Sequence, residues 1–198
     1  MRVTAETKET TRRTILETAE ELFRTQGFET TTTRDIAKAA GIATGTLFNY
    51  FATKEAIVTM LVTSALEQSA KRNSDQQAES LEEALFAYAA SALRLLKPYR
   101  TMLAPVLETS LSPLASGLDD GNDLRAQHLE RVVELAKQHR LDASLSPVAL
   151  QMYWTLYLGV LAFWTNDRSP KQEQTLALLD QSLGMFVGWL RNGDGPSK

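Results

Sequence analysis

The chain has 198 residues, of which 43% are hydrophobic, and its 21 basic and 24 acidic side chains leave a formal net charge of −3. This apolar content can bury a sizeable core, which argues against wholesale disorder. The lack of cysteine excludes disulfides, thiol catalysis and thiolate metal sites, and two histidines are too few for a histidine-based metal cluster. We therefore expect no metal, no cofactor and no catalytic residue.

The N-terminal residues are polar and contain no apolar run of the kind that a secretion signal carries, so we expect a cytoplasmic protein. The hydrophobic pattern is helical nearly throughout, with no convincing strand. A first helix ends at Gly27, after which Phe28 packs back into the core. The apolar face of this helix consists of Ile15, Ala19, Leu22 and Phe23.

The second and third expected helices are joined by a tight turn at Gly41. Ala37 lies four residues before this glycine, and Leu47 lies six residues after it. A small residue where two helices nearly touch, a glycine turn and an apolar anchor are typical of a helix-turn-helix, whose second helix lies in the DNA major groove. Thr32 is a good N-cap for the first of these helices, and Asp35 completes a variant capping box.

About nine helices are expected in all. A third spans about residues 44–50, and Thr53 caps a fourth. Residues 71–79 are polar and form a break, and residues 112–122 form a loop. Serine followed by proline opens each of the last two helices, at 146–147 and 169–170. The helices after the fourth are expected at 81–96, 99–111 with a kink at Pro105, 124–136, 147–166 and 170–192.

Residues 13–61 closely resemble the N-terminal domain of the TetR family of bacterial repressors. The resemblance implies an all-α protein with a three-helix DNA-binding domain at 1–53 and a helical effector-binding and dimerisation domain at 54–198, linked by the helix from about 54. It further implies a repressor released from its operator by a small molecule. The matching residues are Ile15–Phe23, Gly27-Phe28, Thr32, Arg34-Asp35-Ile36-Ala37, Ala40-Gly41-Ile42, Gly45-Thr46-Leu47, Tyr50-Phe51 and Lys54-Glu55.

Two positions depart from the family pattern. The family often has serine or threonine where this chain has Ala43, and often has tyrosine where it has Phe48. An alanine lacks the hydroxyl of an N-cap, a change worth about 1 kcal/mol of helix stability. Thr44 is the alternative cap, which would shift the helix start by one residue. No phosphate contact is carried over to Phe48.

Base sequence can be read only by side chains that project from the first turns of the recognition helix. We expect this role for Thr44, Thr46 and Asn49. An asparagine amide pairs with adenine through two hydrogen bonds, and a threonine methyl can touch a thymine methyl. Gly45 lets the backbone approach the DNA closely. The resemblance adds Arg34 as a phosphate or base contact.

Thr33, Tyr50 and Lys54 are assigned to phosphate groups. Lys54 begins the fourth helix, where free N–H groups and a cation together favour an anion. Such contacts set position and affinity, not sequence preference. The structural alternative is that Thr33 and Thr44 cap helices and that Tyr50 packs beneath the motif.

Residues 148–164 carry no charge and are apolar almost all round, interrupted by Gln151, Thr155 and Gly159 at four-residue spacing. This length lies at the lower edge of the range that spans a membrane, and no second span accompanies it. We therefore expect no membrane partner, but a helix buried on two sides, with one face on a partner subunit and the other on an internal cavity.

The last helix carries a stripe of small residues beside its apolar stripe. Glycines four residues apart allow close helix approach, although each costs about 1 kcal/mol relative to alanine. The resemblance implies a four-helix interface in a homodimer, and the alternative is close packing within one subunit. Two-fold symmetry then requires a pseudo-palindromic operator with half-sites about one helical turn (~34 Å), or a multiple, apart. The small residues are Ala177, Gln181, Gly184 and Gly188.

Aromatic and thioether side chains of the fifth to eighth helices supply a wall suited to an apolar or aromatic effector. Binding there is expected to lower DNA affinity by moving the fourth helix. Two other functions stay open: an all-helical small-molecule carrier or enzyme with a purely structural N-terminal motif, and a DNA-bound regulator without a small-molecule effector. The expected ligand-binding residues are Tyr88, Met102, His128, Trp154, Tyr157 and Phe163.

Overall fold

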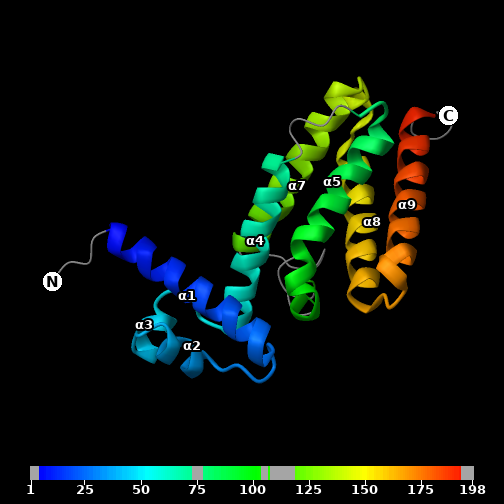
Figure 1. Cartoon of the computed structure of the whole chain (residues 1–198). Coiled ribbons are helices and arrows are strands. Elements are labelled where there is room, and N and C mark those ends of the chain that lie inside the picture. Colours follow the sequence, from blue (N-terminus) through cyan, green and yellow to red (C-terminus); the bar gives the residue numbers. More distant parts are fainter. Residues whose placement is uncertain (1–4, 73–77, 104–106, 108–118, 193–198) are drawn as a thin grey trace. The chain divides into compact units, whose positions relative to one another are not determined.

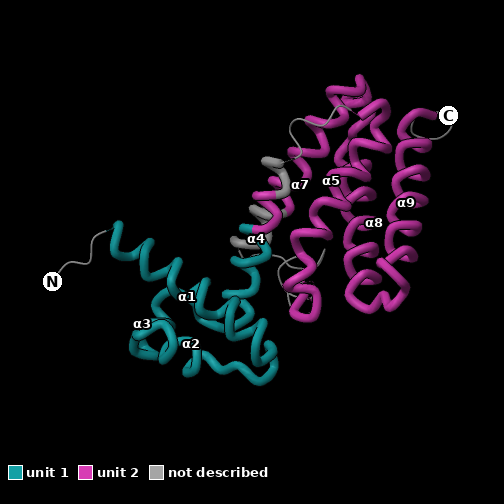
Figure 2. The backbone as a smooth tube through the Cα atoms, in the orientation of Figure 1, with its two compact units in different colours: residues 1–64 teal, residues 65–198 magenta. Residues whose placement is uncertain are grey.

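The structure is a computed structural model that describes residues 5–72, 78–103, 107 and 119–192 (Figure 1). Over these residues it contains eight α-helices, three short 3-10 helices and no strand, which confirms the predicted all-α class. The chain divides into two compact units, residues 1–64 and 65–198, and the division falls within the fourth helix (Figure 2). The sequence had indicated a boundary at the start of that helix.

Unit 1 contains α1 (Ala5–Gln26), α2 (Thr33–Ala39), α3 (Thr44–Phe48) and the first part of α4 (Lys54–Arg72). α2 packs against both α1 and α3. The ring of Phe28 meets the ring of Phe23 edge to face, with the ring centres 5.2 Å apart, which confirms that Phe28 packs back into the core. The core side chains are Ile15, Ala19, Phe23, Phe28, Ile36, Ala37, Leu47, Phe51, Ile57, Val58, Leu61 and Val62.

The turns of unit 1 follow the predicted local signals. Gly27 and Gly41 have φ angles of 89° and 68°, a left-handed conformation that glycine adopts without steric cost. The capping box at the start of α2 is present. The Asp35 N–H donates to Thr32 Oγ1 over 3.2 Å, and the Thr32 N–H donates to Asp35 Oδ2 over 3.0 Å. These bonds fix the start of α2 and therefore the position of the turn that follows it.

α3 begins at Thr44, as predicted, but it ends earlier and its N-cap differs from the prediction. It ends at Phe48, and Asn49 is its C-cap, so the helix is two residues shorter than expected. The N-cap is Ala43, without a side-chain hydrogen bond, so the prediction that Thr44 takes over the cap is wrong. The Ala43 carbonyl already accepts from Thr46 and Leu47, at 2.9 and 3.1 Å. The backbone thus begins the helix at Thr44 while Leu47 anchors it in the core.

Unit 2 contains the last part of α4 and all the helices that follow it. α9 packs against both α5 and α8, and α7 packs against α5. Figure 1 shows α5, α8 and α9 as neighbouring helices. Large buried side chains in this unit include Tyr153, Leu161, Trp164 and Phe186. The elements are α5 (Leu81–Leu96), η1 (Lys97–Met102), α7 (Asp119–Gln138), η2 (Asp142–Ser144), α8 (Pro147–Asn166), η3 (Pro170–Gln172) and α9 (Glu173–Arg191).

Three predicted boundaries in unit 2 change. The start of the expected sixth helix is the 3-10 helix η1, and most of its remainder, including the kink at Pro105, lies outside the described residues. Residues 119–122, expected in a loop, begin α7. The signal at Ser146 is confirmed because its Oγ accepts from the Ala149 N–H over 3.1 Å. The equivalent signal at Ser169 opens only η3, since Lys171 is not helical, and α9 starts at Glu173.

Among the described residues, α8 is the one helix long and apolar enough to cross a membrane by length and composition. It packs against α9, and its side chains Tyr153, Trp154, Leu161 and Trp164 are buried in unit 2. This burial is what a core helix requires on one face, and the predicted burial of a second face against a partner subunit stays a prediction. Its other side exposes Val148.

Candidate nucleic-acid interface and aromatic core

The geometry of α3 separates an anchoring residue from a solvent-facing surface. Leu47 is fully buried beneath the helix, whereas Gly45 and Asn49 are exposed and Thr44 and Thr46 are half-buried. A Cβ atom added to Gly45 would meet no atom within 4 Å. The fold of unit 1 therefore does not require glycine at this position. The three predicted base-reading residues and Gly45 lie within one short stretch that the core leaves accessible.

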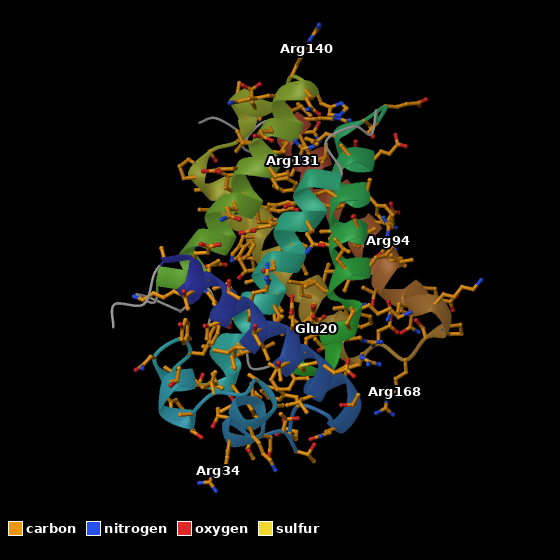
Figure 3. The ribbon with its side chains drawn as sticks, turned by 60° about the vertical axis from the view of Figure 1, so that its left-hand side comes forward. Glu20, Arg34, Arg94, Arg131, Arg140 and Arg168 are labelled. Carbon is orange, nitrogen blue, oxygen red and sulfur yellow. The ribbon has the colours of Figure 1, made fainter. Side chains whose placement is uncertain are left out.

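The predicted contacts on α2 and after α3 occupy different environments. Arg34 is exposed, makes no hydrogen bond or ion pair with the part of the chain that the structure describes, and extends away from the ribbon in Figure 3. Thr33 and Tyr50 are half-buried. Hydrogen bonds from the Thr32 hydroxyl and N–H hold the pKa of Asp35 below its ordinary value. The carboxylate next to Arg34 is therefore part of the capping box at the start of α2.

Lys54 lies at the first residue of α4, as predicted, but its ammonium is already engaged. The nitrogen lies 2.6 Å from the Phe28 carbonyl oxygen, 3.2 Å from that of Thr31 and 3.4 Å from that of Glu29. It also lies 4.2 Å from the centre of the Phe28 ring. Thr53 caps α4, as predicted, because its Oγ1 accepts from the Ala56 N–H over 3.1 Å. Phosphate binding by Lys54 stays a prediction, and the structure adds a second role that accounts for its position.

A buried aromatic cluster occupies the interior of unit 2 around His128. Its Nδ1 lies 3.3 Å from the Tyr88 hydroxyl oxygen, and its Nε2 lies 3.0 Å from the Tyr153 hydroxyl oxygen. The imidazole stacks on the Tyr157 ring with centres 4.2 Å apart, and Trp154 meets it edge-on at 5.6 Å. Of the predicted ligand-binding residues, Tyr88, His128, Trp154 and Tyr157 therefore come together, and Tyr153 is an additional member that the sequence analysis missed.

Burial controls the protonation of this cluster. It lowers the pKa of His128 from 6.5 to about 3 and raises the pKa of Tyr88 to about 12. It also raises the pKa of Tyr153 and Tyr157 well above the ordinary value. The imidazole is therefore neutral at pH 7, with one nitrogen donating and the other accepting. The Tyr157 hydroxyl is buried and has no hydrogen-bond partner among the described residues.

Two other predicted ligand residues differ in placement. Met102 is buried at the end of η1, with 4% of its surface exposed. Phe163 is 41% exposed, so the structure does not bring it together with the buried cluster. Its place on an interior ligand wall is therefore not supported. A periodic aromatic pattern on α8 cannot show which of its two faces meets the core.

The outer faces of α8 and α9 form an apolar groove of about 640 Å³. Of the predicted dimerisation residues, Thr155, Gly159, Ala177, Gln181 and Gly184 are exposed, whereas Gln151 and Gly188 are half-buried. Gln151 also accepts a hydrogen bond from Arg125 Nη2 over 2.6 Å. The groove is lined by Pro147, Val148, Gln151, Met152, Thr155, Leu156, Met185, Phe186 and Trp189. Most of these larger side chains were missed by the sequence analysis, which followed only the small residues.

These features define an all-helical protein with an N-terminal helix-turn-helix, the architecture of a DNA-binding regulator. No group of three or more histidine, aspartate or glutamate residues suited to a metal ion occurs in the described residues. Residues 15–60 match the family described as "Bacterial regulatory proteins, tetR family". Residues 86–194 match the "Tetracyclin repressor-like, C-terminal domain". The chain therefore belongs to the TetR family of bacterial transcriptional regulators.

Individual relatives agree with this assignment. The chain is 40% identical over 183 residues to the HTH-type transcriptional repressor KstR2 of Rhodococcus jostii (strain RHA1), a match that covers 90% of the chain and 79% of that protein. It is 29% identical over 136 residues to the HTH-type transcriptional regulator YfiR of Bacillus subtilis (strain 168), which covers 68% of the chain. That match spans 63% of YfiR, less than two thirds of its length.

A solved structure with the same fold is FadR of Thermus thermophilus, a TetR family repressor in complex with lauroyl-CoA. It superposes with a TM-score of 0.66 and 23% sequence identity, and the match covers 94% of this chain and 96% of that chain. At this identity the likeness concerns the fold alone.

Proposed function

We propose that this chain is a homodimeric transcriptional repressor of the bacterial cytoplasm. It binds a pseudo-palindromic DNA operator and is released by an apolar or aromatic small molecule. The observation that carries the proposal is the geometry of α3, which buries Leu47 and leaves Gly45 and Asn49 exposed. A helix anchored on one side and polar on the other can enter the major groove without unfolding its support. The proposal assigns no catalytic activity.

Base reading falls to Thr44, Thr46 and Asn49. Asn49 follows the last residue of α3. Its exposed side-chain amide has no hydrogen bond to the described residues. Both its donor and its acceptor are therefore available to an adenine edge. Arg34, equally unengaged, and the half-buried Thr33 and Tyr50 are proposed to contact phosphate groups, which position the helix.

Three glycines support dimerisation through α8 and α9. A Cβ atom added to Gly159, Gly184 or Gly188 would meet no atom within 4 Å. Each glycine within a helix costs about 1 kcal/mol relative to alanine, and packing within one subunit gives no reason for that cost. The close approach of a helix from a second copy gives one. The alternative of close packing within one subunit is thereby disfavoured.

The groove beside these glycines supports the same interface. Met185 and Val148 are 72% and 63% exposed, although both are large apolar side chains. Contiguous exposed apolar surface of this kind marks interaction sites. In a two-fold dimer the same face of each subunit is covered by the other, so both copies are buried at once.

The effector is proposed to bind beside the aromatic cluster. A buried hydroxyl without a partner costs about 1–3 kcal/mol, and a ligand that hydrogen-bonds Tyr157 would remove this cost. Trp154 and Tyr88, which belong to the same cluster, supply apolar surface near it. FadR, which shares the fold, was solved with lauroyl-CoA, a ligand that carries an apolar acyl chain. Release from DNA would be transmitted by α4, whose residues belong to both units.

Tyr157→Phe tests this effector site. The substitution removes only the unpaired hydroxyl, so the folded protein should be at least as stable as the wild type in urea unfolding. A ligand that bonds this hydroxyl should bind about 2–12-fold more weakly, corresponding to 0.5–1.5 kcal/mol. Unchanged ligand affinity would remove Tyr157 from the site.

The proposed function as a whole is tested with the DNA upstream of the protein's own coding sequence. Fluorescence anisotropy should show a tight, sequence-specific complex that a panel of fatty acids, aromatic acids and their CoA thioesters weakens selectively. A coupling of about 1–3 kcal/mol corresponds to a 5–150-fold loss of operator affinity, and the operator must weaken ligand binding by the same factor. Tight ligand binding with no DNA preference would favour the carrier, and specific DNA binding without any responsive ligand would favour an effector-independent regulator.

A further inference from the structure

A second cavity, of about 560 Å³, lies in unit 2 apart from both the aromatic cluster and the α8–α9 groove. It is formed by α5, the 3-10 helix η1, the connection between α8 and α9, and the first turn of α9. Its volume is within the usual range for small-molecule sites. It shares no lining residue with the apolar groove. The lining residues are Ala90, Leu93, Arg94, Lys97, Arg100, Asp167, Arg168, Ser169, Lys171, Gln172, Thr175 and Leu176.

Positive charge predominates in the lining of this second cavity, which we call the basic pocket. Five of its lining residues are cations, and Asp167 is its one carboxylate. Arg94, Lys97, Arg168 and Lys171 are exposed, and none of the four has a hydrogen bond or ion pair with the described part of the chain. In Figure 3 Arg94 on α5 and Arg168 after α8 lie on the same side of the ribbon. Like charges gathered in a concave site focus a positive potential on its interior.

The carboxylate of Asp167 offsets one of these five positive charges, but it forms no ion pair with a described residue. Its Oδ2 accepts from the Thr175 hydroxyl and N–H, at 2.6 and 3.0 Å, and its Oδ1 accepts from the Ser169 N–H at 2.8 Å. These bonds, with that from the Thr175 hydroxyl foremost, hold its pKa well below the ordinary value. Asp167 is therefore used to fix the connection between α8 and α9.

The fifth cation is held against the wall of the pocket. Arg100 Nε donates to the Trp164 carbonyl oxygen over 2.7 Å, and its Nη2 donates to the Asp167 carbonyl oxygen. Its guanidinium carbon lies 5.6 Å from the centre of the Trp164 ring. The position of this charge is therefore fixed before any ligand arrives, as an anion site requires.

The backbone of the connection is strained at two adjacent residues. Lys171 and Gln172 have φ angles of 51° and 61°, a left-handed conformation that is unfavourable for residues with a Cβ. A hydrogen bond accounts for the left-handed conformation of Gln172, because its Oε1 accepts from Trp164 Nε1 over 2.9 Å. Lys171 has no partner among the described residues, yet it lines the pocket at a position that glycine or asparagine would occupy more easily. Strain of this kind is concentrated at functional sites.

We propose that this basic pocket binds a small molecule bearing two or more phosphate groups, such as a nucleoside di- or triphosphate. The four exposed cations of the pocket would hold the phosphates. Guanidinium groups, as in Arg94 and Arg168, bind phosphate through paired hydrogen bonds. The apolar residues Leu93 and Leu176 would pack against the uncharged part of the ligand. A concave site with an apolar floor fits a small ligand better than the convex backbone of duplex DNA.

The test is calorimetric titration of the full-length protein at 150 mM salt with adenosine, AMP, ADP, ATP and inorganic pyrophosphate. Affinity should rise with the number of phosphates, by at least tenfold from AMP to ATP, and adenosine should not bind measurably. Pyrophosphate and ADP binding equally would assign recognition to the phosphates alone. Tighter binding of ADP would add the nucleoside to the recognised group.

Variants then locate the site. Arg94→Gln with Lys97→Gln should weaken ATP binding at least tenfold, whereas Lys137→Gln with Arg140→Gln, which removes two exposed cations outside the pocket, should change it less than twofold. Lys171→Gly relieves the backbone strain, so it should preserve or raise the melting temperature while weakening ATP binding severalfold. Absence of binding by every phosphate compound at millimolar concentration would overturn the proposal. Equal weakening by the control pair, or a pocket variant that weakens duplex DNA binding but not ATP binding, would also overturn it.

Discussion

The ammonium nitrogen of Lys54 lies 2.6 Å from the carbonyl oxygen of Phe28 and 4.2 Å from the centre of the Phe28 ring. The same ammonium reaches the carbonyl oxygens of Glu29 and Thr31. One cation on the first residue of α4 thus holds the loop between α1 and α2. The contact therefore joins the start of α4 to this loop through three carbonyl groups.

Lys54→Met should therefore act first on stability. A hydrogen bond to a charged group is worth about 1.5–3 kcal/mol, so we expect a loss of about 1–3 kcal/mol in the free energy of unfolding, measured with urea. DNA affinity should fall for all sequences alike, and an unchanged dependence of affinity on salt would assign this loss to folding alone. If stability is unchanged and the slope of log affinity against log salt falls by about one, Lys54 is a phosphate contact instead.

Gly45→Ala should separate DNA binding from folding. The site has room for a Cβ atom, and alanine is favoured over glycine in a helix by about 1 kcal/mol. The free energy of unfolding should therefore stay the same or rise by up to about 1 kcal/mol. Operator affinity should fall at least tenfold, because the added methyl group occupies the space through which the backbone approaches the DNA. A variant with wild-type operator affinity would show that the backbone does not make this approach.

Gly184→Glu and Gly188→Glu should convert the protein to monomers. A charged side chain on the face shared by α8 and α9 would be buried against a second copy without a partner. Sedimentation velocity should show the monomer mass, and operator binding should be much weaker. Gln138→Glu adds the same charge at an exposed position on α7 and should leave the dimer intact. A tight dimer in both glycine variants would place the interface elsewhere.

His128 should make the folded state sensitive to mild acid. Its pKa is lowered to about 3 in the folded protein by burial, against 6.5 for an ordinary histidine. Below pH 6.5 the unfolded chain binds a proton that the folded chain does not. The free energy of unfolding therefore decreases as the pH is lowered, by up to about 1.4 kcal/mol per pH unit. Above pH 6.5 this contribution is constant.

The measurement is urea unfolding between about pH 5 and pH 7, a window above the pH at which Asp35 and Asp167 begin to titrate in the unfolded chain. His128→Asn should be less stable overall, because it breaks the contacts to Tyr88 and Tyr153, but should lose the slope. An identical slope in the variant and the wild type would assign the pH dependence to other groups.

Local signals in the sequence were sufficient for much of unit 1. The capping box of Thr32 and Asp35 and the glycine turn at Gly41 depend on residues within one turn of each other, and the structure contains both. The burial of Leu47 follows from the same short-range spacing. The end of α3 at Phe48 was not predicted, because the helical pattern alone does not show where the backbone leaves the helix.

Features that depend on long-range packing were not predictable. The three carbonyl groups that Lys54 contacts lie 23 to 26 residues earlier in the chain, and only the folded loop turns them toward it. The pairing of His128 with Tyr88 spans 40 residues. Tyr153 lies one helical turn before Tyr157 on α8 and could have been included from that spacing. The left-handed backbone at Lys171 has no signal in a residue type that usually avoids it.

The central claim is that α3 reads base sequence, and the base preference of Asn49→Ala tests it most directly. The exposed side chain bears no core contact to lose, so unfolding in urea should match the wild type. Affinities should be measured for the operator and for every single-base variant of one half-site. We predict that discrimination at one base position falls by about 1–3 kcal/mol while preferences elsewhere are kept. An unchanged preference at every position would contradict base reading by this residue, and with it the proposed docking of α3.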